Sequence, residues 1–132
     1  MRNIEFEQIA EAVADAAIEA CYELPGDVLE ALKRAVGNES SPTARDILQQ
    51  LLENARIAHR QRIPLCQDTG LVVVFVEQGV GIALKQEPGE EPWTLEDAVN
   101  AGIADGYEKG YMRKSIVAEP LHHRKNTGTN TP

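Results

Sequence analysis

Residues 63–76 read Ile-Pro-Leu-Cys-Gln-Asp-Thr-Gly-Leu-Val-Val-Val-Phe-Val. The composition of the chain changes here, because β-branched residues replace the alanine and leucine of the first sixty positions. The continuous apolar run Leu71–Val76 has the length of a buried strand, and we expect it to be a central one. Further short strands are expected at 82–84 and, at a sheet edge, at 116–117. The predicted fold class is therefore α+β, with about three N-terminal helices, a small mixed sheet and one further helix.

The residues before this stretch are predicted to form helices. Helical spacing of apolar residues predicts a first helix from about Ile4 to Tyr22, ended by Pro25-Gly26. Asp27 is expected to cap a second helix, for which Gly37 is the natural stop. The apolar stripes expected in the core are Ile9, Val13, Ala16, Ala17 and Ala20, then Val28, Leu29, Leu32 and Val36.

Two more helices are predicted from their start signals. Ser41 followed by proline begins a third helix, Pro42 to about His59, and His59 is expected at the surface. Thr94, with Asp97 as its capping partner, begins the last helix, which ends near Gly110. The stripes expected in the core here are Ile47, Leu48, Leu51, Leu52 and Ala55, then Leu95, Ala98, Val99 and Ile103.

Cys66 lies at the junction between a loop and the predicted strand. Gln67, Asp68 and Thr69 place an amide, a carboxylate and a hydroxyl beside its thiol. Functional groups are often held on irregular backbone next to a rigid element. Free cysteine is also among the most buried residue types, so a small buried hydrophobe followed by a turn is the alternative. These residues alone leave both interpretations open.

A second motif near the C-terminus carries a family resemblance when it is taken with the first. Residues 64–70 read Pro-x-Cys-Gln-Asp-Thr-Gly, residues 113–115 read Arg-Lys-Ser, and residues 126–132 read Asn-Thr-Gly-x-Asn-Thr-Pro. In combination they resemble the N-terminal part of the iron-sulfur, class I fumarate hydratases, and the alpha subunit of the L-tartrate dehydratases is similar. The resemblance covers nearly all 132 residues.

The resemblance implies a hydro-lyase that reversibly adds water to fumarate to give malate, with an oxygen-sensitive 4Fe-4S cluster as a Lewis acid. Three cysteines bind the cluster in that family, and Cys66 matches the first of them. Gln67 and Asp68 match positions that line the substrate pocket. Arg113 matches a position whose guanidinium contacts a substrate carboxylate, a pairing for which a planar fork is better suited than lysine. No residue is assigned as the catalytic base.

The chain also departs from that family. It has only two cysteines, and Cys21 lies in a predicted helix and matches no cluster motif. We therefore expect a single-domain N-terminal fragment, residues 1–132, with a helical part (1–60) and a motif-bearing part (61–132), that is inactive alone. The expected partners are a missing C-terminal domain or beta subunit, a dicarboxylate substrate (fumarate and malate, or tartrate), and a second copy in a homodimer. An L-tartrate dehydratase alpha-subunit fragment and a non-catalytic assembly module are the alternatives. We also expect Cys66 to be incompletely buried.

The charge and hydrophobicity of the chain bear on nucleic-acid binding and on membrane spanning. The chain is 42% hydrophobic and 26% charged, and its 13 basic and 21 acidic residues give a net charge of −8. This charge repels a phosphate backbone and does not favour nucleic-acid binding. An anion site would depend on local groups such as Arg113, Lys114, Arg124 and Lys125, which without the resemblance are a solvated basic face. The sequence has neither an apolar run of roughly 18 residues nor a signal-peptide stretch, so we expect a cytoplasmic protein that does not span a membrane.

Overall fold

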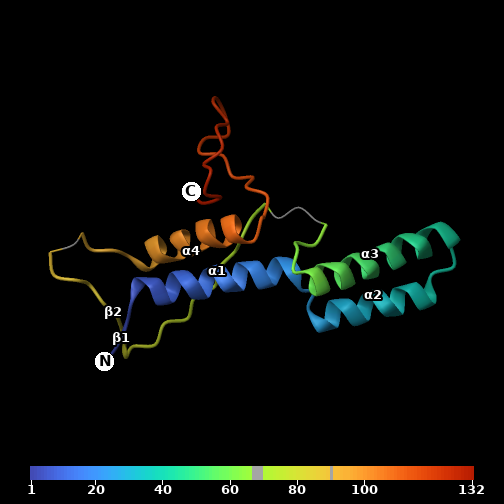
Figure 1. Ribbon diagram of the computed structural model, residues 1–132, viewed down its shortest axis with the longest axis horizontal. Coiled ribbons are helices and arrows are strands. Elements are labelled where there is room, and N and C mark those ends of the chain that lie inside the picture. Colours follow the sequence, from blue (N-terminus) through green and yellow to red (C-terminus); the bar gives the residue numbers. More distant parts are fainter. Residues whose placement is uncertain (67–69, 90) are drawn as a thin grey trace. The chain divides into compact units, whose positions relative to one another are not determined.

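The computed structural model describes residues 1–66, 70–89 and 91–132. The elements in chain order are β1 (Arg2–Ile4), α1 (Phe6–Tyr22), α2 (Gly26–Asn38), α3 (Pro42–Gln61), β2 (Ile82–Leu84) and α4 (Leu95–Lys109) (Figure 1). The chain has three helices, a small sheet whose strands lie before and after them, and one further helix, so the predicted α+β class is confirmed. None of the helices in the described ranges is long and apolar enough to cross a membrane.

The chain divides into two compact units. We call the first the motif unit, made of Met1–Ile18 and Asp68–Pro132, and the second the helical unit, made of Glu19–Gln67. The division falls inside α1, which contributes its first thirteen residues to one unit and its last four to the other.

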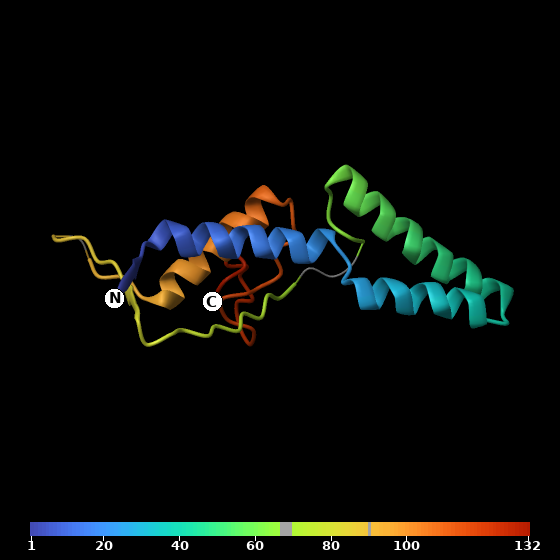
Figure 2. The ribbon, with the colours of Figure 1, turned by 90° about the horizontal axis from the view of Figure 1, so that it is seen from below.

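The helical unit is built on α2 and α3, which run in opposite directions and are joined by residues 39–41 (Figures 1 and 2). Ser41 is the N-cap of α3, as expected, and its hydroxyl accepts a hydrogen bond from the Ala44 amide at 3.4 Å. Its core consists of Ala55, Ala58 and Leu65, with the partly buried Leu24 and Leu29 packed against it.

Parts of the prediction for this unit are wrong. The N-cap of α2 is Pro25, with no side-chain cap, and Asp27 lies in the first turn, where its charge favours the positive end of the helix dipole. No side chain of α2 is buried, and the α3 residues Ile47 and Leu51 are 53% and 47% exposed. Two helices in contact cover only one side of each other, so much of the wide apolar stripe stays exposed.

In the motif unit, α4 packs against the first part of α1 through small residues. Gly102 and Gly106 are buried on α4, and Ala14 and Ala17 are buried on α1. A Cβ atom placed on Gly102 would lie 2.4 Å from the Ala10 carbonyl oxygen, which leaves no room for a side chain. The expected burial of Ala98 and Ile103 is confirmed. The α1 stripe is shifted from the predicted one, because Ala16 and Ala20 are exposed.

The sheet is a parallel pair of short strands rather than a mixed sheet. β1 pairs with β2 in the register Arg2↔Ile82, Asn3↔Ala83 and Ile4↔Leu84. β2 was predicted, whereas β1 occupies residues placed outside or at the start of the first helix. The predicted central strand Leu71–Val76 is wrong, since this segment forms no strand in the described part of the chain. The expected edge strand at 116–117 is reduced to one antiparallel bridge, Val117↔Asn126.

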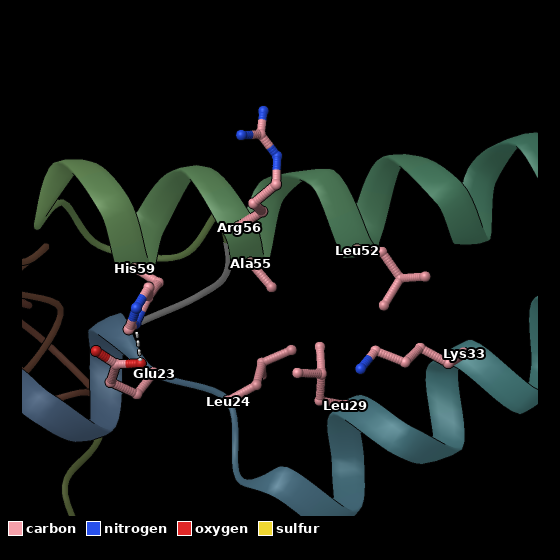
Figure 3. Close-up of a pocket in the computed structure, with 8 residues that line it drawn as sticks. All are labelled: Glu23, Leu24, Leu29, Lys33, Leu52, Ala55, Arg56 and His59. Atoms are coloured by element: carbon pink, nitrogen blue, oxygen red, sulfur yellow. Dashed lines mark hydrogen bonds and ion pairs between the residues drawn. The ribbon is translucent and has the colours of Figure 1, made fainter.

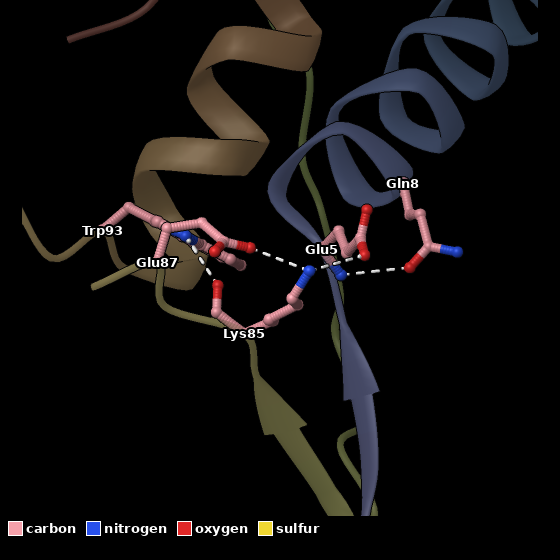
Figure 4. Close-up of polar contacts among 5 residues, drawn as sticks. All are labelled: Glu5, Gln8, Lys85, Glu87 and Trp93. Atoms are coloured by element: carbon pink, nitrogen blue, oxygen red, sulfur yellow. Dashed lines mark hydrogen bonds and ion pairs between the residues drawn. The ribbon is translucent and has the colours of Figure 1, made fainter. Parts of the chain in front are cut away.

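Polar contacts close the end of the motif unit where the strands meet the helices (Figure 4). The Lys85 ammonium pairs with the carboxylates of Glu5 (3.1 Å) and Glu87 (2.8 Å). The Trp93 indole N–H donates to the Lys85 carbonyl oxygen at 3.1 Å, and its ring packs edge-on against Phe6 with the centroids 5.3 Å apart. Trp93 is therefore a packing residue.

Candidate functional site

The position of Arg113 follows from the way α4 ends. The Gly110 amide donates to the Gly106 carbonyl oxygen at 2.8 Å, Tyr111 takes a left-handed conformation (φ 53°), and Met112 is buried. This turn places Arg113 at the surface immediately after a buried anchor. Its Nε–H donates to the Ser115 hydroxyl at 3.2 Å, which orients the base of the guanidinium.

Asn130 is the centre of the hydrogen bonds that hold this region. Its side chain is almost fully buried, and its Oδ1 accepts from the amides of Ser115 (2.6 Å) and Ile116 (3.0 Å). Its Nδ2 donates to the Gly70 carbonyl oxygen at 3.0 Å. One side chain thus connects the C-terminal motif to the Arg-Lys-Ser segment and to the last residue of the cysteine motif.

Asn126 adds a second set of contacts to the same segment. Its Nδ2 donates to the Lys114 carbonyl oxygen at 2.9 Å, and its Oδ1 accepts from the Gly128 amide at 2.7 Å. The Thr127 amide donates to the Ile116 carbonyl oxygen at 3.0 Å. Residues 114–116 are therefore bonded on several backbone groups although they form no regular strand.

The basic residues of this region differ in what they contact. The Lys114 ammonium pairs with the Glu108 carboxylate, so it is not an isolated positive charge. Arg124 has a left-handed backbone (φ 46°), and its amide donates to the Glu119 carbonyl oxygen at 3.0 Å. Arg113 donates from its guanidinium to the Ser115 hydroxyl, and the Ser115 amide donates to Asn130 Oδ1.

Glu119 orders the turn that follows. Its carboxylate accepts from the amides of Leu121 (2.6 Å), His122 (2.7 Å) and His123 (3.0 Å). The amides of His122 and His123, followed by that of Leu121, lower the pKa of Glu119 because they stabilise its charged form. The two histidines act here through their backbone.

Cys66 belongs to the helical unit, where its backbone is anchored and its side chain is exposed. Its amide donates to the Asn54 Oδ1 on α3 at 3.0 Å. The preceding Leu65 is buried, and its amide donates to the Cys21 carbonyl oxygen at 2.9 Å. The expected incomplete burial of Cys66 is confirmed.

A charged cluster at the end of α3 fixes the chain just before Cys66. The Glu23 carboxylate contacts His59 Nδ1 at 2.7 Å and the Arg62 guanidinium at 2.9 Å. Arg62 has a left-handed backbone (φ 52°), and its guanidinium lies 5.0 Å from the Tyr22 ring centre. His59 is exposed, as its position at a helix end predicts.

Cys21 differs from Cys66 in environment. It is partly buried, and desolvation raises the pKa of its thiol, which disfavours the thiolate that would bind a metal. This agrees with its lack of a cluster motif.

The remaining sequence-predicted site residues, Gln67 and Asp68, lie outside the described residues. Cys66 and Arg113 belong to different compact units. Within the motif unit the structure brings together Gly70, residues 113–116 and residues 126–130.

An iron-sulfur cluster would need several ligand side chains close together. Within the described ranges no three or more His, Cys, Asp or Glu side chains are grouped so that they could hold a metal ion. Cys66 is an exposed thiol on an anchored backbone, which suits one ligand of a shared cluster. The chain's own residues therefore fit one position of a three-cysteine set and do not complete it.

A pocket in the helical unit lies away from these residues. It has a volume of about 470 Å³ and lies between α2 and the second half of α3 (Figure 3). It is lined by leucines, an alanine and charged side chains: Glu23, Leu24, Leu29, Lys33, Leu52, Ala55, Arg56 and His59. Among the site residues that the structure describes, neither Cys66 nor Arg113 lines it.

Sequence reasoning missed three positions that organise the site: Asn54, Asn126 and Asn130. The last two lie in the Asn-Thr-Gly-x-Asn-Thr-Pro motif that carries the resemblance, and asparagine is suited to left-handed backbone and to side-chain bonds with nearby backbone. That composition was a usable signal. Asn54 lies inside a helix, and nothing in its sequence context indicates a contact twelve residues away.

Comparison with known proteins agrees with the motifs. The family model described as fumarate hydratase (fumerase) matches residues 10–132. The chain is 32% identical over 128 residues to a putative L(+)-tartrate dehydratase subunit alpha of Methanocaldococcus jannaschii, covering 95% of the chain and 43% of that protein. It is 26% identical over 127 residues to the L(+)-tartrate dehydratase subunit alpha of Escherichia coli K12, covering 95% of the chain and 40% of that protein.

A fumarate hydratase is similar as well. The mitochondrial fumarate hydratase 1 of Leishmania major is 34% identical over 95 residues, which is 71% of the chain and 16% of that protein. The chain thus spans less than half the length of each of these relatives. Because the family match extends over all but the first nine residues, this chain belongs to the fumarate hydratase (fumerase) family.

Proposed function

We propose that these residues are the N-terminal part of an iron-sulfur hydro-lyase that reversibly hydrates fumarate to malate. The supporting observation is the exposed Cys66 thiol, which lies in a segment matched by the family and has a fixed backbone. A 4Fe-4S cluster bound by Cys66 and by two cysteines outside this chain would supply a Lewis acid for the hydroxyl group. In this proposal all 132 residues act as one domain.

Roles for the chain's own residues follow from their chemistry. Arg113 would bind a substrate carboxylate, because it is exposed at a fixed position and its planar guanidinium can form two parallel bonds. Gln67 and Asp68 would line the substrate pocket, a role that rests on their match to the family motif. A dicarboxylate is the substrate class that this set favours, with fumarate and malate first and tartrate second.

The proposed partners come from the same comparison. A domain or beta subunit would supply the remaining ligands and the catalytic base, since this chain has one exposed thiol among its two cysteines. Relatives described as alpha subunits support a separately encoded partner. Exposed apolar side chains support association, including a homodimer, and allow a purely assembling role as the alternative.

The test is an anaerobic iron-sulfur reconstitution of the chain, alone and with the polypeptide that supplies the remaining ligands. Fumarate hydration and tartrate dehydration are then assayed in parallel. We expect brown colour, a cluster spectrum and activity only in the combined sample. Activity on tartrate without activity on fumarate would show that tartrate, and not fumarate, is the substrate. A combined sample without a cluster would contradict the hydro-lyase proposal and favour the assembly role.

A further inference from the structure

The Asn130 side chain uses its hydrogen-bonding groups on residues far away in the sequence. Oδ1 accepts two amide protons, from Ser115 and Ile116, and Nδ2 donates to the carbonyl oxygen of Gly70. The Asn130 amide donates to the Thr127 hydroxyl at 3.2 Å. The residue is only 2% exposed, so breaking these bonds would leave backbone groups without ready access to water.

The backbone of Asn130 is also specialised. Its φ of 62° is left-handed, a conformation that asparagine tolerates better than most residues with a side chain. In this backbone conformation the Asn130 side chain bonds to the Arg-Lys-Ser segment and to Gly70 of the cysteine motif. An asparagine at this position therefore meets a backbone requirement and a side-chain requirement together.

A short relay leads from Asn130 to the guanidinium of Arg113. Asn130 Oδ1 accepts from the Ser115 amide at 2.6 Å, and the Ser115 hydroxyl accepts from Arg113 Nε at 3.2 Å. Asn126 holds the carbonyl group of the intervening Lys114. Hydrogen bonds through Ser115 therefore connect Arg113 to Asn130, which also donates to the Gly70 carbonyl oxygen.

We propose that Asn130, assisted by Asn126, is a positioning residue that fixes the carboxylate-binding Arg113 relative to Gly70, at the end of the cysteine motif. This rests on the proposed function for the role of Arg113. Asn130 touches no substrate in this proposal. Its contribution is to keep the fork of Arg113 at one place and one angle, because a bidentate contact with a carboxylate depends on both.

The first part of the test uses the chain alone. Asn130→Gly removes the side chain and keeps a residue suited to the left-handed backbone. Hydrogen exchange followed by nuclear magnetic resonance should show at least about tenfold faster exchange of the Ser115 and Ile116 amides, with α4 amides unchanged. The Arg113 Nε–H signal should broaden or vanish. Asn38→Gly, the same change at an exposed helix end, is the control and should alter neither.

Two further variants keep the result decisive. If Asn130→Gly loses protection throughout α4, Asn126→Gly is measured instead, because it removes the bond to Lys114 while the Asn130 side chain remains. A change limited to residues 113–116 supports the proposal, and unchanged exchange there overturns it. Ser115→Ala breaks only the last step of the relay, so it should weaken the Arg113 Nε–H signal and leave the Ile116 amide protected.

The second part uses the complete enzyme, with its cluster and partner. Asn130→Gly and Ser115→Ala should each raise the KM for the dicarboxylate about tenfold, with kcat changed less than about threefold, because substrate binding is weakened before and during the reaction alike. Faster amide exchange with an unchanged KM would overturn the positioning role. If the parent enzyme converts no dicarboxylate, the proposed function fails, and the Arg113 Nε–H signal of the chain alone still decides whether Asn130 positions Arg113.

Discussion

At the scale of single residues, the two thiols of this chain differ in accessibility. Cys66 is exposed, whereas Cys21 is partly buried and its pKa is raised by desolvation. Thiolates are the reactive species, so exposure favours reaction at Cys66 and the raised pKa of Cys21 disfavours reaction there. The same properties are required of a thiol that binds a metal shared with another part of a protein.

Limited alkylation should therefore modify Cys66 first. With iodoacetamide at about pH 8, we expect Cys66 to react at least about tenfold faster than Cys21, and Cys21 to need a higher pH because its pKa is raised. Peptide mass spectrometry after timed quenching gives both rates. Cys66→Ser isolates the rate of Cys21. Equal rates in the parent chain would show that Cys66 is covered in solution.

Glu119 gives a pH-dependent prediction. Its pKa is lowered in the folded chain by the amides of His122 and His123, so its contribution is complete above its ordinary value of about 4.5. That contribution is lost as the pH falls through the lower folded value, because the protonated carboxyl group is a weaker acceptor. We expect the His122 and His123 amides to be protected at about pH 6 and to lose protection at about pH 3.

The matching variant is Glu119→Gln, which keeps the shape of the side chain and removes its charge. Its His122 and His123 amides should show little change in protection over the same pH range, once the intrinsic pH dependence of exchange is subtracted. A parent chain whose protection is equally independent of pH would contradict the role of Glu119.

At the scale of elements, the contact between α1 and α4 depends on the absence of side chains. Gly102 and Gly106 lie four residues apart on one face of α4, against Ala10 and Ala14 of α1. A Cβ atom on Gly106 would lie 2.9 Å from the Ala14 carbonyl oxygen. The backbones of α1 and α4 are therefore in near contact, and Tyr107, the residue after Gly106, is buried.

Gly102→Ala should destabilise the motif unit although alanine is the better helix former. The gain in helix propensity is about 1 kcal/mol, and the clash with backbone that cannot rotate away costs more, so we expect a net loss of about 1 to 3 kcal/mol. Urea unfolding followed by Trp93 fluorescence and circular dichroism measures it. Gly37→Ala, whose added methyl group meets nothing within 4 Å, should be neutral or slightly stabilising. Equal effects of the two substitutions would contradict the close packing.

The elements also show what sequence reasoning can and cannot reach. Caps are local, so Ser41 and the Thr94–Asp97 capping box were predicted correctly. The segment Leu71–Val76 was not, because a strand requires a partner and its composition says only that it could pair. Of the core positions expected on α3, Ala55 is buried, whereas Ile47 and Leu51 are exposed because the burial of a side chain depends on what else packs against it.

The candidate site likewise has features that local sequence indicates and features that depend on the fold. The resemblance predicts site roles for Cys66 and Arg113 from motifs. Their exposure follows from local anchors that the sequence partly indicates, such as the apolar Leu65 before Cys66. The contacts of Asn130 with Gly70 and of Asn54 with Cys66 connect separate elements. Side-chain-to-backbone bonds of this kind have no periodicity, so they appear only when the fold is known.

At the scale of the whole molecule, the apolar segment after Gly70 leaves several large side chains uncovered. Leu71, Val73 and Phe75 are 77%, 73% and 93% exposed, whereas the alternate residues Val74 and Val76 are 39% and 55% exposed. The exposed fraction alternates along the segment although it forms no strand, and the most exposed side chains are all apolar. Uncovered apolar patches favour association.

This segment should make the chain associate in solution. Sedimentation velocity over a range of concentrations should show a mass above that of the monomer, and Phe75→Ser should shift the distribution toward the monomer. Leu121→Ser is the control, because Leu121 is also 81% exposed but lies outside the segment. A parent chain that stays monomeric at high concentration would contradict both the association and the proposed homodimer.

The most direct measurement is the cluster content of the complete protein, produced and purified without oxygen, for the parent, Cys66→Ser and Cys21→Ser. Iron and sulfide analysis is combined with visible absorption and electron paramagnetic resonance. If Cys66 is a cluster ligand, Cys66→Ser should lose most of the cluster or change its spectrum, while Cys21→Ser should match the parent. A Cys66→Ser protein with the cluster content and spectrum of the parent would contradict the assignment of Cys66, and with it the proposed place of this chain in an iron-sulfur hydro-lyase.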